Sequence, residues 1–264
     1  MEAFRVVRPR EGERPLIVEI PHAGLLADGR ALATMQCSAT SLARDADLYV
    51  DELYDAAHEA GATILAAHTS RYMVDLNRSE EDVDEESVVG AGNRVRATRG
   101  LIWRLTSAGE PILRAPLSQE ELARRVETYY RPYHRELSSL IADTRRRFGY
   151  AVVLAAHSMP DSGKIRADIV PGTQGRTSAS GPIIDAVDQF WTGHDYHVVH
   201  DTPYRGGFVT QFYGRPREHV HVVQLELARR LYMDDVTLAP DRARFANLRS
   251  HCSAFIRALA QVKP

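Results

Sequence analysis

Short apolar runs alternate with stretches of helical spacing along the first part of the chain. Residues 16–20, LIVEI, form an apolar run that stops at Pro21, and residues 62–70, ATILAAHTS, form a second one. Between them, residues 41–60 carry apolar side chains at helical spacing, and Gly61 follows as a helix terminator. A helix followed by a buried strand predicts an α/β sheet with helices packed over it.

The same alternation continues in the second half of the chain. The pattern predicts one long helix over residues 118–148, where Ser118 and Glu121 have the spacing of a capping box. Pro132 lies inside this stretch, so we expect it to kink the helix or break it in two. The run AVVLAAHS, residues 151–158, is the clearest buried strand of the chain.

Shorter elements and loops complete the expected order. The pattern predicts a helix over 182–192, strands over 196–201 and at the start of 219–233, and a last amphipathic helix over 240–262. Polar or glycine-rich composition predicts loops over 79–100, 161–181 and 204–214. Because no repeat, low-complexity linker or change in composition divides the chain, we expect a single domain over residues 1–264.

Composition and charge narrow the possible classes of protein. The chain has 264 residues, of which 44% are hydrophobic and 26% charged, which is typical of a globular protein. A net charge of −2 argues against a general nucleic-acid binder, which needs a basic face. The two cysteines lie far apart and predict neither a disulfide framework nor a zinc ribbon. Without a signal peptide or a run of about 20 apolar residues, we expect a cytoplasmic protein that has no membrane span.

Histidines and carboxylates stand where the predicted strands end. His22 follows the first strand and His157 closes the run AVVLAAHS, and open α/β sheets bind ligands at these ends of their strands. Two neutral imidazoles and one more ligand typically hold a catalytic zinc ion. Asp47 and Asp45 are favoured over Asp51 as the third ligand, because they lie closer to the start of the predicted helix. Each histidine taken alone is more often a hydrogen-bonded structural residue.

A carboxylate and an arginine-rich turn add further candidate chemistry. Glu226 lies on the last predicted strand and is a candidate general base, although it can also form an ion pair with Arg229 or Arg230 at helical spacing. The stretch SRYMVDLNR, residues 70–78, leaves the second strand with an acid, an amide and two arginines. It is either a solvated loop or a clamp for a carboxylate, because the arginine fork makes two parallel hydrogen bonds to that group.

Several short motifs together resemble the N-formylglutamate amidohydrolase family. They are PHAG at 21–24, RDADLYVDELY at 44–54, SRYMVDLNR at 70–78, YYRPYH at 129–134, AAHSMP at 155–160, YRGGFVTQFYG at 204–214 and QLELARRLYM at 224–233. Each motif is short, but their order and spacing over most of the chain are specific. The family is related to the zinc carboxypeptidases and the aspartoacylases. The resemblance therefore implies a zinc-carboxypeptidase-like, phosphorylase/hydrolase-like three-layer sandwich, with a mixed twisted sheet flanked by helices.

The resemblance also implies the roles of individual residues. His22 and His157 look like two ligands of one zinc ion, and Glu226 looks like the catalytic glutamate. The carboxypeptidase pattern places its acidic ligand at the position of Leu25, which cannot bind zinc, so that Asp47 or Asp45 would replace it.

The substrate side of the site follows from the same resemblance. The DLNR turn, with Asp75, Asn77 and Arg78, would bind the substrate, and Asp75 would orient the neighbouring arginine or cap the turn. Arg71 would help to polarise the scissile carbonyl. Arg205, beside two glycines, would meet a second carboxylate of the substrate, with a solvent-facing loop charge as the alternative.

Together these features predict a zinc-dependent hydrolase that cleaves the amide bond of an N-acylated amino acid. The family resemblance points to N-formyl-L-glutamate, with formate and glutamate as products, and to amino-acid catabolism such as histidine degradation. The expected partner is a small N-acyl amino acid, with no nucleic acid or membrane, and the oligomeric state stays open. Two alternatives also stay open: an amidase for another N-acyl amino acid or small peptide, and a non-catalytic carboxylate-binding protein on the same scaffold.

Overall fold

The computed structural model describes residues 2–92, 98–161 and 166–264 of the chain. They fall into two compact units. One comprises Met1–Arg5, Pro21–Leu48 and Ala67–Glu136, and the other comprises Val6–Ile20, Tyr49–Ala66 and Leu137–Pro264. The expectation of a single domain over residues 1–264 stays a prediction.

The described residues contain one six-stranded mixed sheet with the strand order β1-β3-β2-β4-β6-β5. Its strands are β1 (Phe4–Val7), β2 (Leu16–Ile20), β3 (Thr63–Ala67), β4 (Ala151–Met159), β5 (Ile169–Gly172) and β6 (Val220–Ala228). β2 runs parallel to β3 and to β4, β4 runs parallel to β6, and β5 is antiparallel to β6. The predicted α/β class with a mixed sheet is therefore confirmed.

The middle strands of this sheet are buried along their whole length. All nine residues of β4 and all nine of β6 are buried, as are the five of β2. Parallel strands that are covered by helices on both faces read as near-continuous apolar runs, which is why LIVEI and AVVLAAHS were recognisable in the sequence. The register of these strands fixes which side chains meet at the carboxyl edge.

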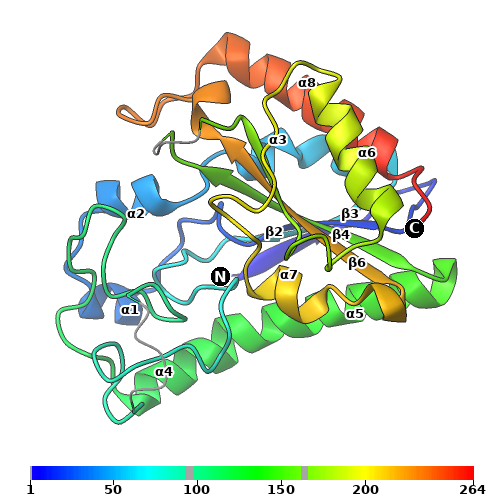
Figure 1. Ribbon diagram of the computed structural model, residues 1–264. Helices are drawn as coiled ribbons and strands as arrows, with labels where there is room; N and C mark the ends of the chain where they lie inside the picture. The colour runs from blue at the N-terminus through cyan, green and yellow to red at the C-terminus, as the bar shows by residue number, and fades with distance from the viewer. Residues whose placement is uncertain (1, 93–97, 162–165) are drawn as a thin grey trace. The chain divides into compact units, whose positions relative to one another are not determined.

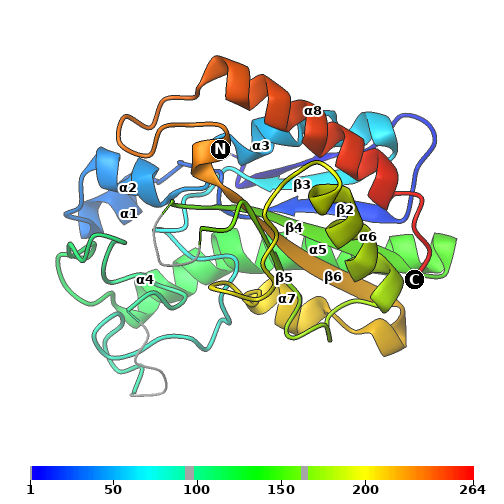
Figure 2. The ribbon, with the colours of Figure 1, turned by 45° about the horizontal axis from the view of Figure 1, so that its top comes forward.

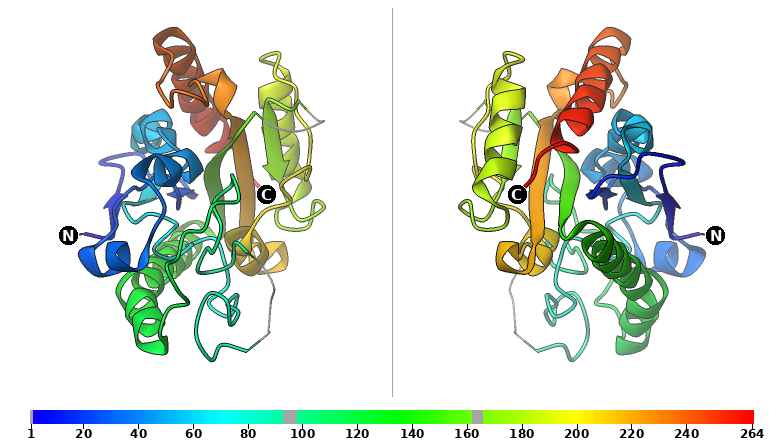
Figure 3. Two further views of the ribbon diagram at one scale, coloured as in Figure 1. Left: turned by 90° about the vertical axis from the view of Figure 1, so that its left-hand side faces the viewer. Right: turned by 90° about the vertical axis from the view of Figure 1, so that its right-hand side faces the viewer.

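Helices of the second unit cover this sheet. They are α3 (Val50–Leu53), η1 (Asp55–Ala60), the greater part of α5 (Arg131–Phe148), α6 (Gly181–Thr192), α7 (Phe208–Tyr213), η3 (Pro216–Glu218), η4 (Arg229–Leu231) and α8 (Arg242–Leu259). Figure 1 shows α8 and α5 on opposite sides of the strands, and the turned views in Figures 2 and 3 agree. None of the helices in the described part of the chain is long and apolar enough to cross a bilayer.

The last helix shows how such a helix is held against its neighbours. The buried residues of α8 are Leu248, Cys252, Phe255, Ile256 and Leu259. Their spacing of three and four places them on one stripe of the helix. The helix starts at Asp241, whose carboxylate accepts hydrogen bonds from the N–H groups of Ala243 and Arg244. The predicted amphipathic helix over 240–262 is confirmed within two or three residues.

The other unit is built from short helices and long irregular segments around its own core. Its helices are α1 (Gly29–Thr34), α2 (Ala39–Asp45), α4 (Gln119–Arg125), the π-helical turn η2 (Val126–Tyr130) and the start of α5. The buried core residues are Ala31, Met35, Tyr72, Met73, Val88, Ile102, Trp103, Ile112, Leu113 and Leu117. The segment 79–100, predicted as a loop, contributes Val88 to this core.

The helix predicted over residues 41–60 is wrong as a continuous element. α2 ends at Asp45, because Ala46 is extended with ψ 152°, and Tyr49 adopts a left-handed conformation with φ 66° before α3 begins. In this gap the backbone N–H of Asp47 donates to the carbonyl of His22 at 2.9 Å. The break therefore ties Asp47 to the segment that follows β2.

The long helix predicted over residues 118–148 is confirmed with one interruption. Ser118 caps α4 by accepting the N–H of Glu121 at 3.1 Å. The turn before Pro132 widens into η2, where the N–H of Arg131 donates to Val126 rather than to the residue four before it. Pro132 has no N–H and its ring crowds the preceding turn, so a π-type turn is the expected accommodation.

Other elements differ from the sequence pattern where the pattern was short. The stretch 196–201 is not a strand, since only Val198 bridges to Ile169. Residues 208–213, predicted as loop, form α7, and residues 169–172, also predicted as loop, form β5. β1 and α1 were not predicted. Runs of four to six residues carry too few apolar positions to reveal a period.

His134 gives this fold a pH dependence. Its ring Nε2 lies 3.0 Å from the carbonyl oxygen of Leu76, so it joins the start of α5 to the DLNR turn. Burial lowers the pKa of His134 to about 4 from its usual 6.5. Between these values the unfolded chain binds the proton and the folded chain does not, so stability is lost as the pH falls. We expect His134 to make the free energy of unfolding about 2 kcal/mol smaller at pH 5 than at pH 7.

Urea unfolding of the His134→Gln variant at both pH values measures this contribution, because glutamine keeps a donor for Leu76 but does not titrate. The variant should lose less stability than the wild type between pH 7 and pH 5. His197→Gln, at an exposed position, is the matched control. Equal pH dependence of the His134 variant and the wild type would exclude the assignment.

Candidate active site

Three neighbouring parallel strands deliver polar residues to the same edge of the sheet. In the register of β4 with β6, His157 pairs directly with Glu226. In the register of β2 with β4, Glu19 pairs with Ala155, and His22 follows two residues after β2 ends. Continuing this register brings the segment Pro21–His22 level with His157–Ser158. The sequence prediction that these strand ends meet therefore agrees with the register.

The ring of His22 is held by a buried carboxylate. Its Nε2 lies 2.7 Å from Oδ1 of Asp75, and both side chains are at most 1% exposed. Burial alone would raise the pKa of Asp75, but the hydrogen-bonded His22 ring and the charges of Arg71 and Arg78 outweigh it and hold that pKa well below the usual range. An ionised Asp75 only accepts hydrogen bonds, so Nε2 of His22 donates to it, and in the neutral ring the lone pair lies on Nδ1.

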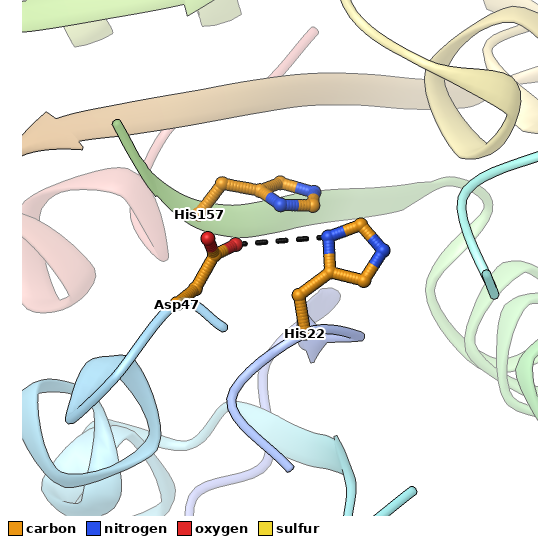
Figure 4. A group of neighbouring side chains, drawn as sticks. All are labelled: His22, Asp47 and His157. Atoms are coloured by element: carbon orange, nitrogen blue, oxygen red, sulfur yellow. Dashed lines mark ion pairs between the residues drawn. The ribbon is translucent and has the colours of Figure 1, made fainter. Parts of the chain in front are cut away.

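The Nδ1 side of the His22 ring faces a second carboxylate. Nδ1 of His22 lies 3.7 Å from Oδ2 of Asp47, and Asp47 is 2% exposed. His22, Asp47 and His157 are all buried, and each offers one ligand atom within 4.8 Å of the others. Figure 4 shows the two imidazoles and the carboxylate turned toward a common point. Among the residues that the structure describes, this is the one such group of three or more potential ligands.

The choice between the two candidate aspartates follows from what surrounds each of them. Asp45 is committed elsewhere, because its Oδ2 accepts the hydroxyl of Tyr72 at 2.6 Å and the N–H of Ser107 at 2.7 Å. Asp47 belongs to the group with the two histidines. Two imidazoles and one carboxylate in a buried setting fit the donor set of a catalytic zinc site.

Arg71 lies beside the same group. Its Nη2 donates to Oδ2 of Asp75 at 3.3 Å, and its Nη1 lies 3.9 Å from Oδ1 of Asp47. The guanidinium also stacks on Trp103, 4.5 Å from the ring centroid. Trp103 in turn donates its indole N–H to Oδ2 of Asp75 at 2.8 Å. Sequence reasoning missed Trp103, because a lone tryptophan in an irregular segment carries no recognisable spacing.

The DLNR turn is built around Asp75. Oδ1 of Asp75 also accepts the backbone N–H of Asn77 at 2.8 Å, and the carboxylate is fully buried. Both oxygens of Asp75 thus accept hydrogen bonds from protein groups, among them His22 and Arg71. The expectation that Asp75 binds the substrate, and that it orients the neighbouring arginine or caps the turn, stays a prediction.

The other two polar residues of this turn have distinct surroundings. Asn77 is 3% exposed. Arg78 is half-buried, and its Nε and Nη1 donate to the carbonyls of Arg99 and Asn77 at 2.8 and 3.0 Å. These two bonds set the plane of the guanidinium. Neither of them uses its second terminal nitrogen, Nη2.

Glu226 lies next to the histidine of β4. It is 5% exposed, and its Oε1 accepts a hydrogen bond from Nε2 of Gln224 at 2.8 Å. The register pairs Glu226 with His157 on one side and with Val170 on the other. Glu226 lies on β6, two residues before the strand ends at Ala228, and not on a helix with Arg229 and Arg230.

Arg205 sits on an exposed segment that is anchored by its glycines. The backbone of Gly206 has φ 99°, and a Cβ on Gly172 would lie 2.6 Å from the nitrogen of Gly206. The RGG segment, residues 205–207, therefore runs directly over the end of β5, where only glycine leaves room for it. The exposed Arg205 side chain reaches over Gly175, with Nη2 at 3.3 Å from the position of a Cβ there.

Comparisons with known proteins find one family. The family model described as N-formylglutamate amidohydrolase matches residues 14–233. The N-formylglutamate deformylase of Pseudomonas aeruginosa is 35% identical over 273 aligned residues, which cover 96% of this chain and 93% of that protein. The N-formylglutamate deformylase of Pseudomonas putida is 34% identical, with 88% of this chain and 86% of that protein covered.

Solved structures give the same picture. The crystal structure of N-formylglutamate amidohydrolase from Ralstonia eutropha JMP134 matches with a TM-score of 0.92 and 29% identity, covering 99% of this chain and 98% of that one. A gene product of Agrobacterium tumefaciens shares the fold at a TM-score of 0.71 and 17% identity, over 98% of this chain and 95% of that one.

Asp75 is the residue that holds the ring of His22 most directly. We expect Asp75→Asn to weaken zinc binding about 10–100-fold, because an amide oxygen holds the Nε2–H less firmly and the amide NH₂ can favour the other tautomer. Competition between the protein and a chromophoric chelator measures the affinity.

Asp84→Asn is the matched control for this measurement. Asp84 is also buried and accepts a backbone N–H, from Ser87 at 2.9 Å, but it touches no histidine. The control should bind zinc like the wild type. If the Asp75 variant and the control have the same affinity for zinc, Asp75 does not contribute to metal binding.

Proposed function

The chain belongs to the N-formylglutamate amidohydrolase family, and we propose that it hydrolyses the amide bond of N-formyl-L-glutamate to formate and glutamate with the help of one zinc ion. The observation that carries this proposal is the buried group of His22, Asp47 and His157, with Glu226 paired to His157 in the sheet. Relatives at 35% and 34% identity that are named N-formylglutamate deformylase support the choice of substrate.

His22, Asp47 and His157 would hold the metal, with Nδ1 of His22 as the ligand atom because Asp75 holds Nε2. A zinc ion held there would supply Lewis-acid polarisation of the carbonyl and would lower the pKa of water toward about 7. Two histidines and one carboxylate are a ligand set that is found in catalytic zinc sites.

Glu226 is the proposed general base. Its carboxylate takes a proton from the attacking water and returns it to the nitrogen of the leaving amine. The hydrogen bond that Gln224 donates to Oε1 holds this carboxylate in place. The near-complete burial of Glu226 keeps bulk water from competing for that proton.

Arg71 is the proposed partner of the carbonyl oxygen. Asp75 and the face of Trp103 fix its guanidinium, so no reorganisation is needed as negative charge develops on that oxygen. A single preorganised donor of this kind is commonly worth about 3–4 kcal/mol in the transition state.

Asn77, Arg78 and Arg205 are the proposed contacts for the carboxylates of the substrate. Two backbone carbonyls orient Arg78, which leaves an edge of its fork for the α-carboxylate. Arg205, on the glycine-anchored segment, would pair with the side-chain carboxylate of a glutamyl substrate.

A substrate panel tests the proposal. We expect turnover of N-formyl-L-glutamate, loss of activity on dialysis against a chelator, and recovery with Zn²⁺. N-acetyl, N-succinyl and other N-formyl amino acids should react more slowly. Preference for one of these would identify an amidase of different specificity, and absence of all turnover despite bound metal would leave a binding protein.

Glu226→Gln separates catalysis from metal binding. The amide cannot accept the proton from water, so we expect kcat to fall about 10²–10⁴-fold while bound zinc stays at the wild-type level. Stopped-assay kinetics and elemental analysis of the same preparation give both numbers. Glu218→Gln, an exposed residue just before β6, is the control. Full activity of the Glu226 variant would remove it from the mechanism.

Arg78→Ala tests the carboxylate clamp. Losing a charge-assisted hydrogen bond to the α-carboxylate costs about 1.5–3 kcal/mol, so KM should rise about 10–150-fold with a smaller change in kcat. Arg78→Lys keeps the positive charge but lacks the planar guanidinium, so its KM should lie between that of the wild type and that of Arg78→Ala. Arg114→Ala, at an exposed position, should match the wild type. Unchanged KM in Arg78→Ala would contradict the clamp.

A further inference from the structure

Gln224 joins two parts of the site that the sequence keeps apart. It is 4% exposed in β6, and it pairs with Gly172 in the register of β5 with β6. Its Oε1 accepts the backbone N–H of Gly207 at 2.8 Å, and its Nε2 donates to Oε1 of Glu226 at 2.8 Å. One amide thus contacts both the RGG segment and the proposed general base.

The orientation of this amide is not free. The N–H of Gly207 can only donate, so it must face the amide oxygen of Gln224. The amide NH₂ then has to point at Glu226, where the carboxylate can accept from it. The RGG segment itself cannot shift toward the sheet, since Gly172 lies directly beneath Gly206.

A second glutamine holds the same segment from the other side. Nε2 of Gln174 donates to the carbonyl of Gly206 at 2.7 Å, and the N–H of Gln174 donates to the carbonyl of Arg205 at 2.9 Å. Gln174 is therefore a contact of the segment alone, whereas Gln224 contacts the segment and Glu226. The two glutamines provide an internal comparison.

We propose that Gln224 is a positioning residue for the reaction: the N–H of Gly207 fixes its amide, which in turn fixes the Glu226 carboxylate in the orientation that proton transfer requires. This rests on the proposed function, because it assigns Glu226 the proton. Gln224 donates directly to Oε1 of Glu226, so we assign it a role that acts through Glu226.

Gln224→Glu isolates this role. The new carboxylate still accepts from Gly207, so the segment stays in place. It cannot hold Glu226 as the amide does, because two buried carboxylates at this distance repel each other or share one proton. We expect kcat on N-formyl-L-glutamate to fall about 10–100-fold, with KM within about twofold of the wild type. Gln224→Ala removes both bonds and should lower kcat and raise KM together.

Gln174→Ala should have the opposite effect on KM and kcat. It loosens the segment that carries Arg205 without touching Glu226, so KM should rise several-fold while kcat stays near the wild-type value. Ser178→Ala is the structural control. The hydroxyl of buried Ser178 donates at 2.6 Å to the carbonyl of Val222, which lies on the same strand as Gln224, and it touches no site residue. It should change neither constant, whatever its effect on thermal stability.

The measurements are steady-state kinetics of the zinc-loaded variants, with elemental analysis and thermal unfolding of each preparation. A fall in kcat for Gln224→Glu at wild-type zinc content and unchanged KM supports the proposal. Wild-type kcat in that variant overturns it while leaving the proposed function intact, as does an equal fall in kcat for Gln174→Ala. A wild-type enzyme without turnover on any N-acyl amino acid overturns the proposed function and this inference with it.

Discussion

The parallel register of β2, β4 and β6 is the constraint on which the whole site depends. It pairs His157 with Glu226 residue for residue and brings the end of β2 level with them, so His22 leaves the sheet at the same edge. Residues more than two hundred positions apart lie at this edge because the hydrogen bonds between strands determine which residues of neighbouring strands stand side by side. A slip by one residue in either pair would turn one of these side chains to the opposite face of the sheet.

The polar side chains at this edge are buried in an ordered set of contacts. Asp75 accepts from His22, Asn77, Arg71 and Trp103, so this single carboxylate orients the His22 ring and the Arg71 guanidinium. On β6, Gln224 donates a hydrogen bond to Glu226. Buried charges are costly unless they are paired and hydrogen-bonded, and both clusters meet that condition. Preorganisation of this kind is what an electrostatically assisted hydrolysis requires.

Much of the architecture could be predicted from the sequence, for reasons that differ between elements. The strands LIVEI and AVVLAAHS were found because parallel strands buried on both faces read as continuous apolar runs. His22, His157 and Glu226 were predicted as site residues because they stand at or near the ends of such runs. The break between α2 and α3 was missed, since the hydrogen bond from Asp47 to His22 that lies within it is not local in the sequence. Trp103 and the central place of Asp75 were missed for the same reason.

The central claim is that His22, Asp47 and His157 bind one divalent ion, and anomalous diffraction tests it most directly. Crystals of protein purified without added metal, measured on both sides of the zinc edge, should show one strong anomalous peak. We expect it about 2.0–2.2 Å from one nitrogen of each histidine and from an oxygen of Asp47. Absence of the peak in zinc-soaked crystals, or a peak that lacks any of these three side chains among its ligands, would contradict the account.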